Sequence, residues 1–361
     1  MKKRITLESM GYFNLARGIG MVIIIGGHSA NIFFDSSRNM QTGIQSAGSI
    51  LGGGIMAMFF LISGYQFYKR SSKKCLSIQK KNLLYPYWLT FFCIIMTKFF
   101  LSVIEKRPFM EHGGEYILTA LLGLNAEHGA IWKGIPIESV SIFWFVLALF
   151  GGWVIYNYVL DIKNKYLQWG ILIGCLFLSW GLSLVAKVWV FCLPLALLAV
   201  FFLAMGEKIR KYHLLERRLP VWSYFLMGGL LIFCGMFGQV DMVVCQWKLG
   251  PIDMMGSLCC GFLLLRLYCK GMEKIKENRI ISFLESIGFY SMWIICFHCY
   301  EKIIFPWYRL KSLFILHPVM GTMVCLMLRS MVMFGMFKIV SPVLARMNVF
   351  WKKSKRRWGR R

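Results

Sequence analysis

The stretch Asn14-Leu-Ala-Arg-Gly-Ile-Gly-Met-Val-Ile-Ile-Ile-Gly-Gly-His28 places Arg17 and His28 inside one long apolar run, with ten residues between them. A charged side chain at the centre of a bilayer costs roughly 2.5–3.5 kcal/mol on insertion scales, so it is seldom there without a role. If the run is a helix, the steps from Arg17 to His28 turn through about 1100°, or three turns plus about 20°. We therefore expect both side chains on nearly the same face, about 16.5 Å apart along the axis.

The composition places the chain among membrane proteins. Of its 361 residues, 58% are hydrophobic and only 16% are charged, whereas soluble domains carry roughly 25% charged residues. The apolar residues occur in blocks of about twenty, the length that spans a bilayer core. The sequence therefore predicts an all-α, polytopic integral membrane protein with about ten transmembrane helices. We expect spans at 13–34, 48–67, 83–104, 140–160, 166–184, 188–206, 221–239, 250–269, 287–304 and 319–341.

The net charge of +26 is distributed unevenly over the loops between these spans. One set of alternate loops, together with both ends of the chain, carries most of the lysines and arginines. By the positive-inside rule this set is cytoplasmic, which predicts a multi-pass protein of the cell membrane with both termini in the cytoplasm. Topology and contact with anionic membrane lipids account for the basic balance without a nucleic-acid partner. We expect a transmembrane domain over 1–345 and a basic cytoplasmic tail over 346–361. No small-residue cleavage site follows the first block, so we expect it to remain as the first span.

The cysteines do not indicate a metal centre. Most of the twelve lie inside predicted spans, where free cysteine behaves as a small apolar residue. Cys296 and Cys299 flank His298 in a C-x-x-C pattern, but the surrounding span offers too few further ligands for a metal or redox site. We interpret these thiols as ordinary packing and predict no metal site.

Ser63 and Tyr65 lie at the predicted cytoplasmic end of the second span, level with Arg17 rather than with His28. A hairpin of the first two spans places them beside Arg17 at the inner mouth. A helix-end packing motif with an interfacial tyrosine is the alternative interpretation.

Lys80 and Lys81 form a basic cluster that meets the aromatic residues Tyr85-Pro-Tyr-Trp88 at the inner surface. Pro86 suits the first turn of a helix, because its missing N–H is not needed there. The pair is either a plain interfacial anchor or a helper of Arg17 in binding a polyanionic cytosolic ligand.

On the outer side, Trp144 belongs to a Phe-Trp-Phe segment that is alternatively a plain aromatic belt. His298 and Glu301 are three residues apart, so they are neighbours on one helix face at a depth similar to His28. A carboxylate orients an imidazole and raises its pKa. Arg329, in the middle of the last span, also needs a partner, and Glu301 is a candidate.

These features, taken in chain order, resemble the motifs of acyltransferase family 3, a family of integral membrane acyltransferases. The closest likeness is to the branch of fucose 4-O-acetylase-like sugar O-acetyltransferases, and it covers nearly the whole chain. The matching segments are Arg17-x10-His28, Met58-Phe-Phe-Leu-Ile-Ser-Gly-Tyr65, Lys81-Asn-Leu-Leu-Tyr-Pro86, Phe143-Trp-Phe145 and Ser291 through His298. Their order and spacing together are more specific than any one of them.

The resemblance implies an O-acyltransferase, in the enzyme class that transfers acyl groups other than amino-acyl groups. Its donor substrate is acyl-CoA, most often acetyl-CoA, and it has no permanently bound cofactor. The acceptor implied is a hydroxyl of a surface carbohydrate or lipid-linked glycan outside the cytoplasm. The outer loop 105–139, with a short helix expected at 115–124, is long enough to cover an acceptor site.

The residues that match the family motifs receive roles from this resemblance. Arg17 is expected at the donor entrance, where it meets the phosphates of acyl-CoA. His28 is expected to act as general base on the acceptor hydroxyl, since an imidazole pKa of about 6.5 suits proton abstraction near neutral pH, or to carry the acyl group covalently. The predicted substrate-binding residues are Ser63, Tyr65, Lys80, Lys81, Trp144, His298 and Glu301.

Two positions depart from the family pattern. Asn14 stands where the branch usually has an acidic residue, so a charge partner for Arg17 comes from elsewhere or from the ligand. Lys80 and Lys81 stand where arginine is usual, and lysine offers a point charge instead of a bidentate fork.

Two other functions remain open at this stage. A polytopic transporter or exporter of a glycan intermediate also fits ten spans with intramembrane charge, although neither an inverted repeat nor paired broken helices are visible. A membrane-bound sensor that uses the same module only for binding is the third hypothesis, and no appended domain supports it.

Overall fold

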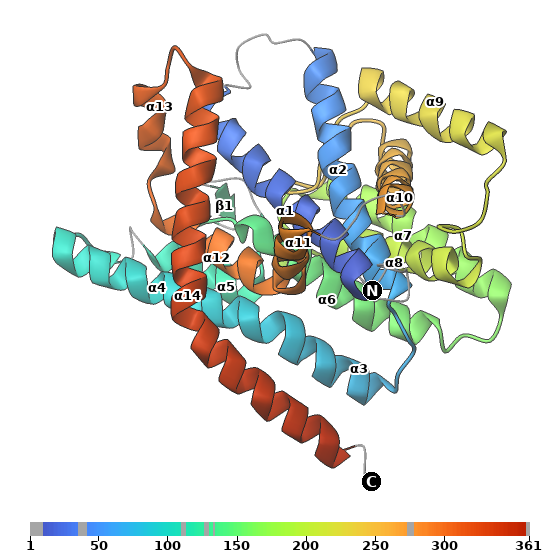
Figure 1. Ribbon diagram of the computed structural model, residues 1–361, viewed down its shortest axis with the longest axis horizontal. Coiled ribbons are helices and arrows are strands. Elements are labelled where there is room, and N and C mark those ends of the chain that lie inside the picture. Colours follow the sequence, from blue (N-terminus) through green and yellow to red (C-terminus); the bar gives the residue numbers. More distant parts are fainter. Residues whose placement is uncertain are drawn as a thin grey trace.

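Helices form almost the whole of the structure (Figure 1). The computed structural model describes the backbone of residues 10–34, 42–109, 113–125, 130–132, 134–272 and 278–358, and the side chains of 12–34, 48–109, 113–125, 130–132, 134–271 and 278–342. The basic residues before position 10, parts of the 105–139 loop and the side chains of the predicted 346–361 tail lie outside these ranges.

The longer helices are α1 (Met10–Phe33), α2 (Thr42–Tyr65), α4 (Tyr85–Glu105), α6 (Trp144–Val159), α7 (Lys165–Val185), α8 (Leu193–Lys211), α9 (Val221–Phe237), α10 (Pro251–Met272) and α14 (Pro318–Trp358). The shorter helical elements are α3 (Ser72–Gln79), the π-helix η1 (Lys80–Leu84), α5 (Glu115–Leu122), η3 (Ser141–Phe143), η4 (Val190–Cys192), α11 (Arg279–Phe289), α12 (Ser291–Ile304), η5 (Trp307–Arg309) and α13 (Leu310–Leu313). Two small antiparallel pairs complete the described part, β1 (Ala130–Trp132) with β2 (Ile135–Ile137) and β3 (Val240–Asp241) with β4 (Gln246–Trp247).

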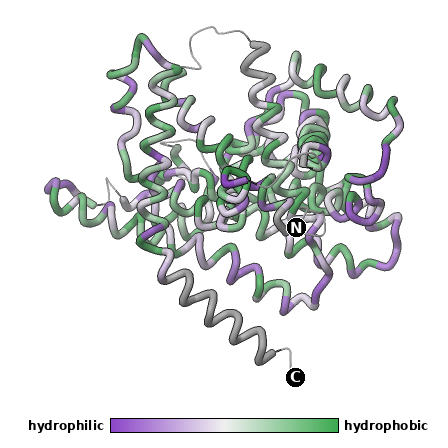
Figure 2. Tube along the Cα trace, in the orientation of Figure 1, coloured by the Kyte–Doolittle hydropathy of each residue, from purple (hydrophilic) through white to green (hydrophobic). Residues whose placement is uncertain are grey.

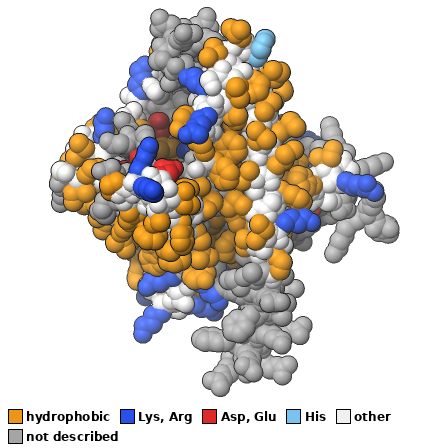
Figure 3. Space-filling model, turned by 90° about the vertical axis from the view of Figure 1, so that its left-hand side faces the viewer, with side chains coloured by type: hydrophobic (Ala, Val, Ile, Leu, Met, Phe, Trp, Pro, Cys, Tyr) orange, Lys and Arg blue, Asp and Glu red, His pale blue; other side chains and the backbone are white. Residues whose placement is uncertain are grey.

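The prediction of an all-α, polytopic membrane protein is confirmed. Within the described residues, eight helical stretches are long and apolar enough to cross a membrane, or nine if the bent pair of α11 and α12 counts as one span. The apolar helix α9, with 17 residues, is shorter. Each of the ten predicted spans coincides with one of these stretches, with the bent pair or with α9. Figure 2 shows hydrophobic residues along most helices and hydrophilic residues mainly in the connections. On one face, hydrophobic side chains cover a broad middle zone (Figure 3).

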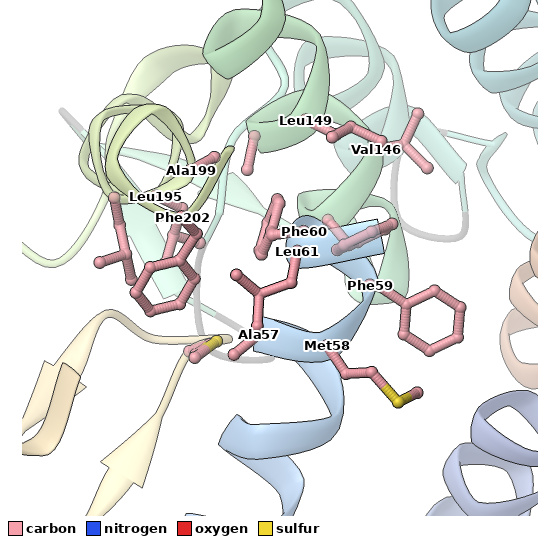
Figure 4. Packing of buried hydrophobic residues seen from close by; sticks show 14 of the residues in the cluster. Ala57, Met58, Phe59, Phe60, Leu61, Val146, Leu149, Leu195, Ala199 and Phe202 are labelled. Atoms are coloured by element: carbon pink, nitrogen blue, oxygen red, sulfur yellow. The ribbon is translucent and has the colours of Figure 1, made fainter. Parts of the chain in front are cut away.

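The core lies where α2, α6 and α8 meet (Figure 4). The ring centroid of Phe60 on α2 is 4.8 Å from that of Phe145 on α6 and 6.1 Å from that of Phe202 on α8. Residues 195–204 of α8 are buried without a break, as expected of a helix that is apolar all round. Gly64 allows the close approach of α2 and α8, since a methyl group there would lie 2.2 Å from the carbonyl oxygen of Leu203.

The third predicted span begins earlier than expected. The sequence placed its start at residue 83, whereas the helix runs from Ser72 through η1 to Glu105. At the π-turn the N–H of Tyr85 donates to the carbonyl of Lys80, five residues back. Pro86 follows directly and has no N–H to donate, so the ladder of hydrogen bonds is interrupted at this point. The basic pair Lys80-Lys81 therefore lies within a continuous helix.

The predicted span at 287–304 corresponds to a bent pair of helices, and the bend was not predicted. The chain bends by 77° between α11 and α12, because the backbone of Tyr290 leaves the helical conformation. Gly288 and Gly18 bring α11 onto the backbone of α1: methyl groups there would lie 1.7 Å from the carbonyl oxygen of Asn14 and 1.9 Å from that of Leu284. The bend then lets α12 leave α1 at a new angle, toward the end that carries His28.

The short helix expected at 115–124 is present as α5 and ends two residues earlier, at Leu122. It is tied to the bundle, because the hydroxyl of Tyr87 donates to the carbonyl of Ala120 over 2.9 Å and that of Thr119 to the carbonyl of Glu138 over 2.6 Å. The sequence did not predict the two β-hairpins.

Candidate active site

Helix α1 carries Arg17 and His28 in one continuous helical segment, as predicted. Arg17 lies where α1 meets the end of α2, and its Nη2 donates to Oε1 of Gln66 over 2.6 Å. Phe13, one turn earlier, packs its ring 4.9 Å from the ring of Tyr65. The end of the second span therefore lies level with Arg17.

Arg17 has no carboxylate partner among the described residues. The one polar contact found for it there is the neutral amide oxygen of Gln66. Asn14, which stands where an acidic residue was expected, uses its backbone carbonyl to pack against Gly288. The residue as a whole is partly accessible, and a guanidinium without a carboxylate keeps its capacity to bind an anionic ligand.

The other end of α1 brings two imidazoles together. The ring centroids of His28 and His298 are 5.4 Å apart, with the planes tilted by 46°. His28 is partly accessible, whereas His298 is completely buried. Nδ1 of His298 is 2.6 Å from Oε1 of Glu301, so the predicted neighbours on α12 do form a hydrogen-bonded pair. The equal depth predicted for His28 and His298 is confirmed.

Arg329 forms an ion pair with Glu301, as the sequence suggested. Its Nε donates to Oε1 of Glu301 over 2.9 Å and to Oε2 over 3.2 Å. The indole N–H of Trp307 also donates to Oε2 of Glu301, and Nη1 of Arg329 lies 3.4 Å from Oγ of Ser29, next to His28. These contacts join α12, η5, α14 and α1 around the histidine pair.

Lys302 adds a second positive charge to this end of the site. It lies four residues after His298 on α12 and so shares a helix face with it. Unlike Arg329, its side chain is exposed. The described end of the site therefore holds a buried, paired arginine and, on α12, an exposed lysine.

The remaining predicted site residues have other surroundings. Ser63 donates to the carbonyl of Phe59 in its own helix over 2.9 Å. The backbone carbonyl of Tyr65 accepts from Nη1 of Arg210 over 2.7 Å. Trp144 is 4% exposed and lies in the core, not in a surface belt.

Lys80 and Lys81 are exposed on η1, which packs against α3, α4 and α6. Arg17, by contrast, lies at the junction of α1, α2 and α11. The structure thus assigns the lysines and Arg17 to different helix contacts, and a shared role in ligand binding stays a prediction.

All twelve cysteines are free thiols in the described structure. Cys296 faces the carbonyl of Pro86, with Sγ 3.8 Å from the oxygen. In the loop between α9 and α10, burial raises the pKa of the Cys245 thiol to about 12. Within the described residues, no group of three or more His, Cys, Asp or Glu side chains has the arrangement of a metal site.

A family model described as an acyltransferase domain matches residues 10–337, nearly the whole chain. The chain belongs to the acyltransferase 3 family. Comparisons with curated proteins and with solved structures found no match. The all-α bundle around α1 is therefore the fold of a membrane acyltransferase, and both Arg17 and His28 lie within the matched region.

Four neighbours of the site were not singled out from the sequence: Gln66, Ser29, Lys302 and Trp307. Gln66 directly follows the Ser-Gly-Tyr segment, and Ser29 directly follows His28, so their proximity to motif residues was a usable signal. Lys302 follows Glu301 and shares the spacing of His298, which was also visible. Trp307 reaches Glu301 only because the chain turns back after Pro306, and no periodic pattern indicates that.

Proposed function

We propose that this membrane acyltransferase transfers an acetyl group from cytosolic acetyl-CoA to a hydroxyl of a glycan or glycolipid outside the cytoplasm. The observation that carries the proposal is the arrangement on α1, where a guanidinium without a carboxylate partner and an imidazole at the centre of a polar cluster occupy the same helix. The acyltransferase family supplies the reaction class, and these two residues supply a donor end and a reacting end.

Arg17 suits the donor end. Acetyl-CoA is a polyanion, and a guanidinium makes strong charge-assisted hydrogen bonds to phosphate. Because the described residues offer Arg17 only a neutral partner, a bound phosphate would not have to displace a protein carboxylate. With this end facing the cytoplasm, both termini of the chain are cytoplasmic and the protein is a multi-pass component of the cell membrane.

His28 suits the reacting end. A distance of about 16.5 Å along the helix separates it from Arg17, and the thin pantetheine arm of acetyl-CoA is long enough to bring the thioester to that depth. There, His28 either removes the proton of the acceptor hydroxyl or carries the acetyl group between donor and acceptor.

The acceptor approaches from the outer side in this proposal. His298, Glu301 and Lys302 lie on α12 at that end of the site. Helix α5 is bonded through the hydroxyl of Tyr87 to α4, which packs against α12. Hydroxyl acceptors on lipid-linked or surface glycans meet these residues without crossing the bilayer. The predicted substrate-binding residues Ser63, Tyr65, Lys80, Lys81 and Trp144 remain candidates for substrate contact on their respective helices.

The decisive experiment supplies labelled acetyl-CoA to membranes that contain the protein and follows the label into lipid-linked and surface glycan. Wild type is expected to transfer label, and His28→Ala is expected to lose transfer by roughly 1000-fold, within the usual range for an acid–base group. His317→Ala, an exposed histidine on the outer side, is the matched control. Transfer by His28→Ala at the wild-type rate, at equal protein amount, would remove His28 from the mechanism.

A further inference from the structure

The contacts of Glu301 determine the protonation pattern of the buried cluster. Its carboxylate accepts from Nε of Arg329 and from the indole N–H of Trp307, and both of these groups are donors only. Both carboxylate oxygens are therefore acceptors. Nδ1 of His298, 2.6 Å from Oε1, must then be the protonated nitrogen of its ring.

A neutral imidazole protonated on Nδ1 has a bare lone pair on Nε2. In His298 this atom is completely buried, and no group in the described part of the chain donates a hydrogen bond to it. A buried acceptor left without a donor is costly, and such groups concentrate at functional sites. The ring of His28 lies beside that of His298, with the centroids 5.4 Å apart, so a nitrogen of His28 is the donor that we assign to Nε2.

The difference in exposure orders the two histidines. His28 is partly accessible and His298 is not, so a substrate meets His28 first and His298 lies behind it. We propose, on the basis of the function above, that His298 is a positioning and proton-relay residue for His28. Arg329 and Trp307 fix it in this role by holding Glu301.

The proposed step moves two protons together. As the acceptor oxygen bonds to the thioester carbonyl carbon, the hydroxyl proton passes to one nitrogen of His28, and the proton on its other nitrogen passes to Nε2 of His298. When the carbon–sulfur bond breaks, the relayed proton returns from Nε2 of His298 to His28, and His28 passes the former hydroxyl proton to the departing sulfur, so that coenzyme A leaves as the thiol. Positive charge therefore appears on His298, which has a carboxylate at 2.6 Å, rather than on His28, which has no carboxylate contact in the described structure.

The relay is tested by measuring how many protons move in the rate-limiting transition state. Initial rates of labelled acetyl transfer are measured in membranes across mixtures of H2O and D2O. Two protons that move together give a curved dependence of rate on deuterium content, whereas a single proton gives a straight line. We expect a curved dependence for wild type, and for His298→Gln a straight line with kcat lower by roughly 100-fold and unchanged affinity for acetyl-CoA.

Trp307→Phe provides a second variant if His298→Gln fails to fold, because it removes the indole donor to the carboxylate and backbone carbonyl of Glu301 and keeps an aromatic ring near Arg329. Its kcat is expected to fall about 3–10-fold, the value of one hydrogen bond, with KM unchanged. The matched controls are Trp222→Phe, an exposed tryptophan on α9, and His317→Gln, and both are expected to behave as wild type.

The possible failures are distinguishable. If wild type transfers acetyl groups but gives a straight line, or if His298→Gln retains wild-type kcat and curvature, the relay is wrong and the proposed function stands. A higher KM for acetyl-CoA with an unchanged kcat in Trp307→Phe also contradicts the relay. If wild type transfers no acetyl group to any membrane glycan, the proposed function and the relay are both overturned.

Discussion

The two ends of α1 hold a positive charge in different ways. At one end, Arg17 is partly accessible and its contact is with the neutral side chain of Gln66. At the other end, Arg329 is 1% exposed and is bonded to Glu301, which is completely buried. Among the described residues, one arginine lacks a carboxylate partner, and the other is paired with a carboxylate inside the protein.

The difference separates binding from architecture within one site. A buried ion pair is stable only while both charges and their hydrogen bonds are present, so Arg329 and Glu301 hold the parts of the site in position. A guanidinium that lacks an internal carboxylate keeps its capacity for an anionic ligand. Substitutions at the two ends should therefore affect different quantities, stability at one end and ligand affinity at the other.

The largest expected effect is on stability, at the Arg329 end. Arg329→Met leaves the carboxylate of Glu301 buried without its cation, which costs about 3–5 kcal/mol. The measurement is the thermal unfolding of the purified protein in detergent. Arg309→Met, an exposed arginine on η5, is the control and should leave unfolding unchanged.

A double variant sharpens this prediction. Glu301→Gln combined with Arg329→Met removes both charges, and we expect it to recover part of the lost stability, because no uncompensated ion remains. An equal loss in the single and double variants would show that shape, rather than charge, holds this end together.

The next largest effect is on affinity, at the Arg17 end. Arg17→Ala should weaken acetyl-CoA binding by about 10–100-fold, corresponding to the loss of a charged hydrogen bond, with little change in unfolding. Binding of labelled acetyl-CoA to the purified protein measures this directly. Lys73→Ala, an exposed cation on α3, provides the same loss of net charge elsewhere, and unchanged affinity in Arg17→Ala would exclude Arg17 from the donor site.

The third effect tests whether the Ser-Gly-Tyr segment beside Arg17 is shaped by packing. Gly64→Ala places a methyl group 2.2 Å from the carbonyl oxygen of Leu203, and such overpacking typically costs about 1–3 kcal/mol. Gly174→Ala is the control, because its surroundings in the described structure are open and alanine favours a helix. Equal unfolding temperatures of the Gly64 and Gly174 variants would contradict the close packing of α2 on α8.

The sequence predicted which residues lie at each end of the site better than it predicted the contacts between different helices. The helical period placed Arg17 and His28 on one helix, and the spacing of three paired His298 with Glu301. Even the pairing of Arg329 with Glu301 followed from the need of a buried charge for a partner. These inferences use local geometry or charge balance, which a single sequence contains.

The contacts that arise from distant segments were not predictable in the same way. The bend at Tyr290 depends on how Gly288 meets the backbone of α1, and the bond from Trp307 depends on a turn after Pro306. A helical period shows which residues share a face, but it does not show which other helix that face meets. For this reason the sequence did not predict that the partner of Arg17 is the amide of Gln66.

The smallest expected effect concerns Ser63, which the motif resemblance places among the substrate-binding residues. Its hydroxyl donates to the carbonyl of Phe59 one turn earlier in the same helix, a bond that slightly weakens a helix rather than supporting it. Ser63→Ala should therefore change stability by less than about 0.5 kcal/mol and leave acetyl-CoA affinity within a factor of about two, far from the effect of Arg17→Ala. The binding assay used for Arg17 measures both variants side by side. A loss of affinity in Ser63→Ala as large as in Arg17→Ala would mean that the hydroxyl turns from Phe59 to the ligand on binding, and the binding end of α1 would then extend onto α2.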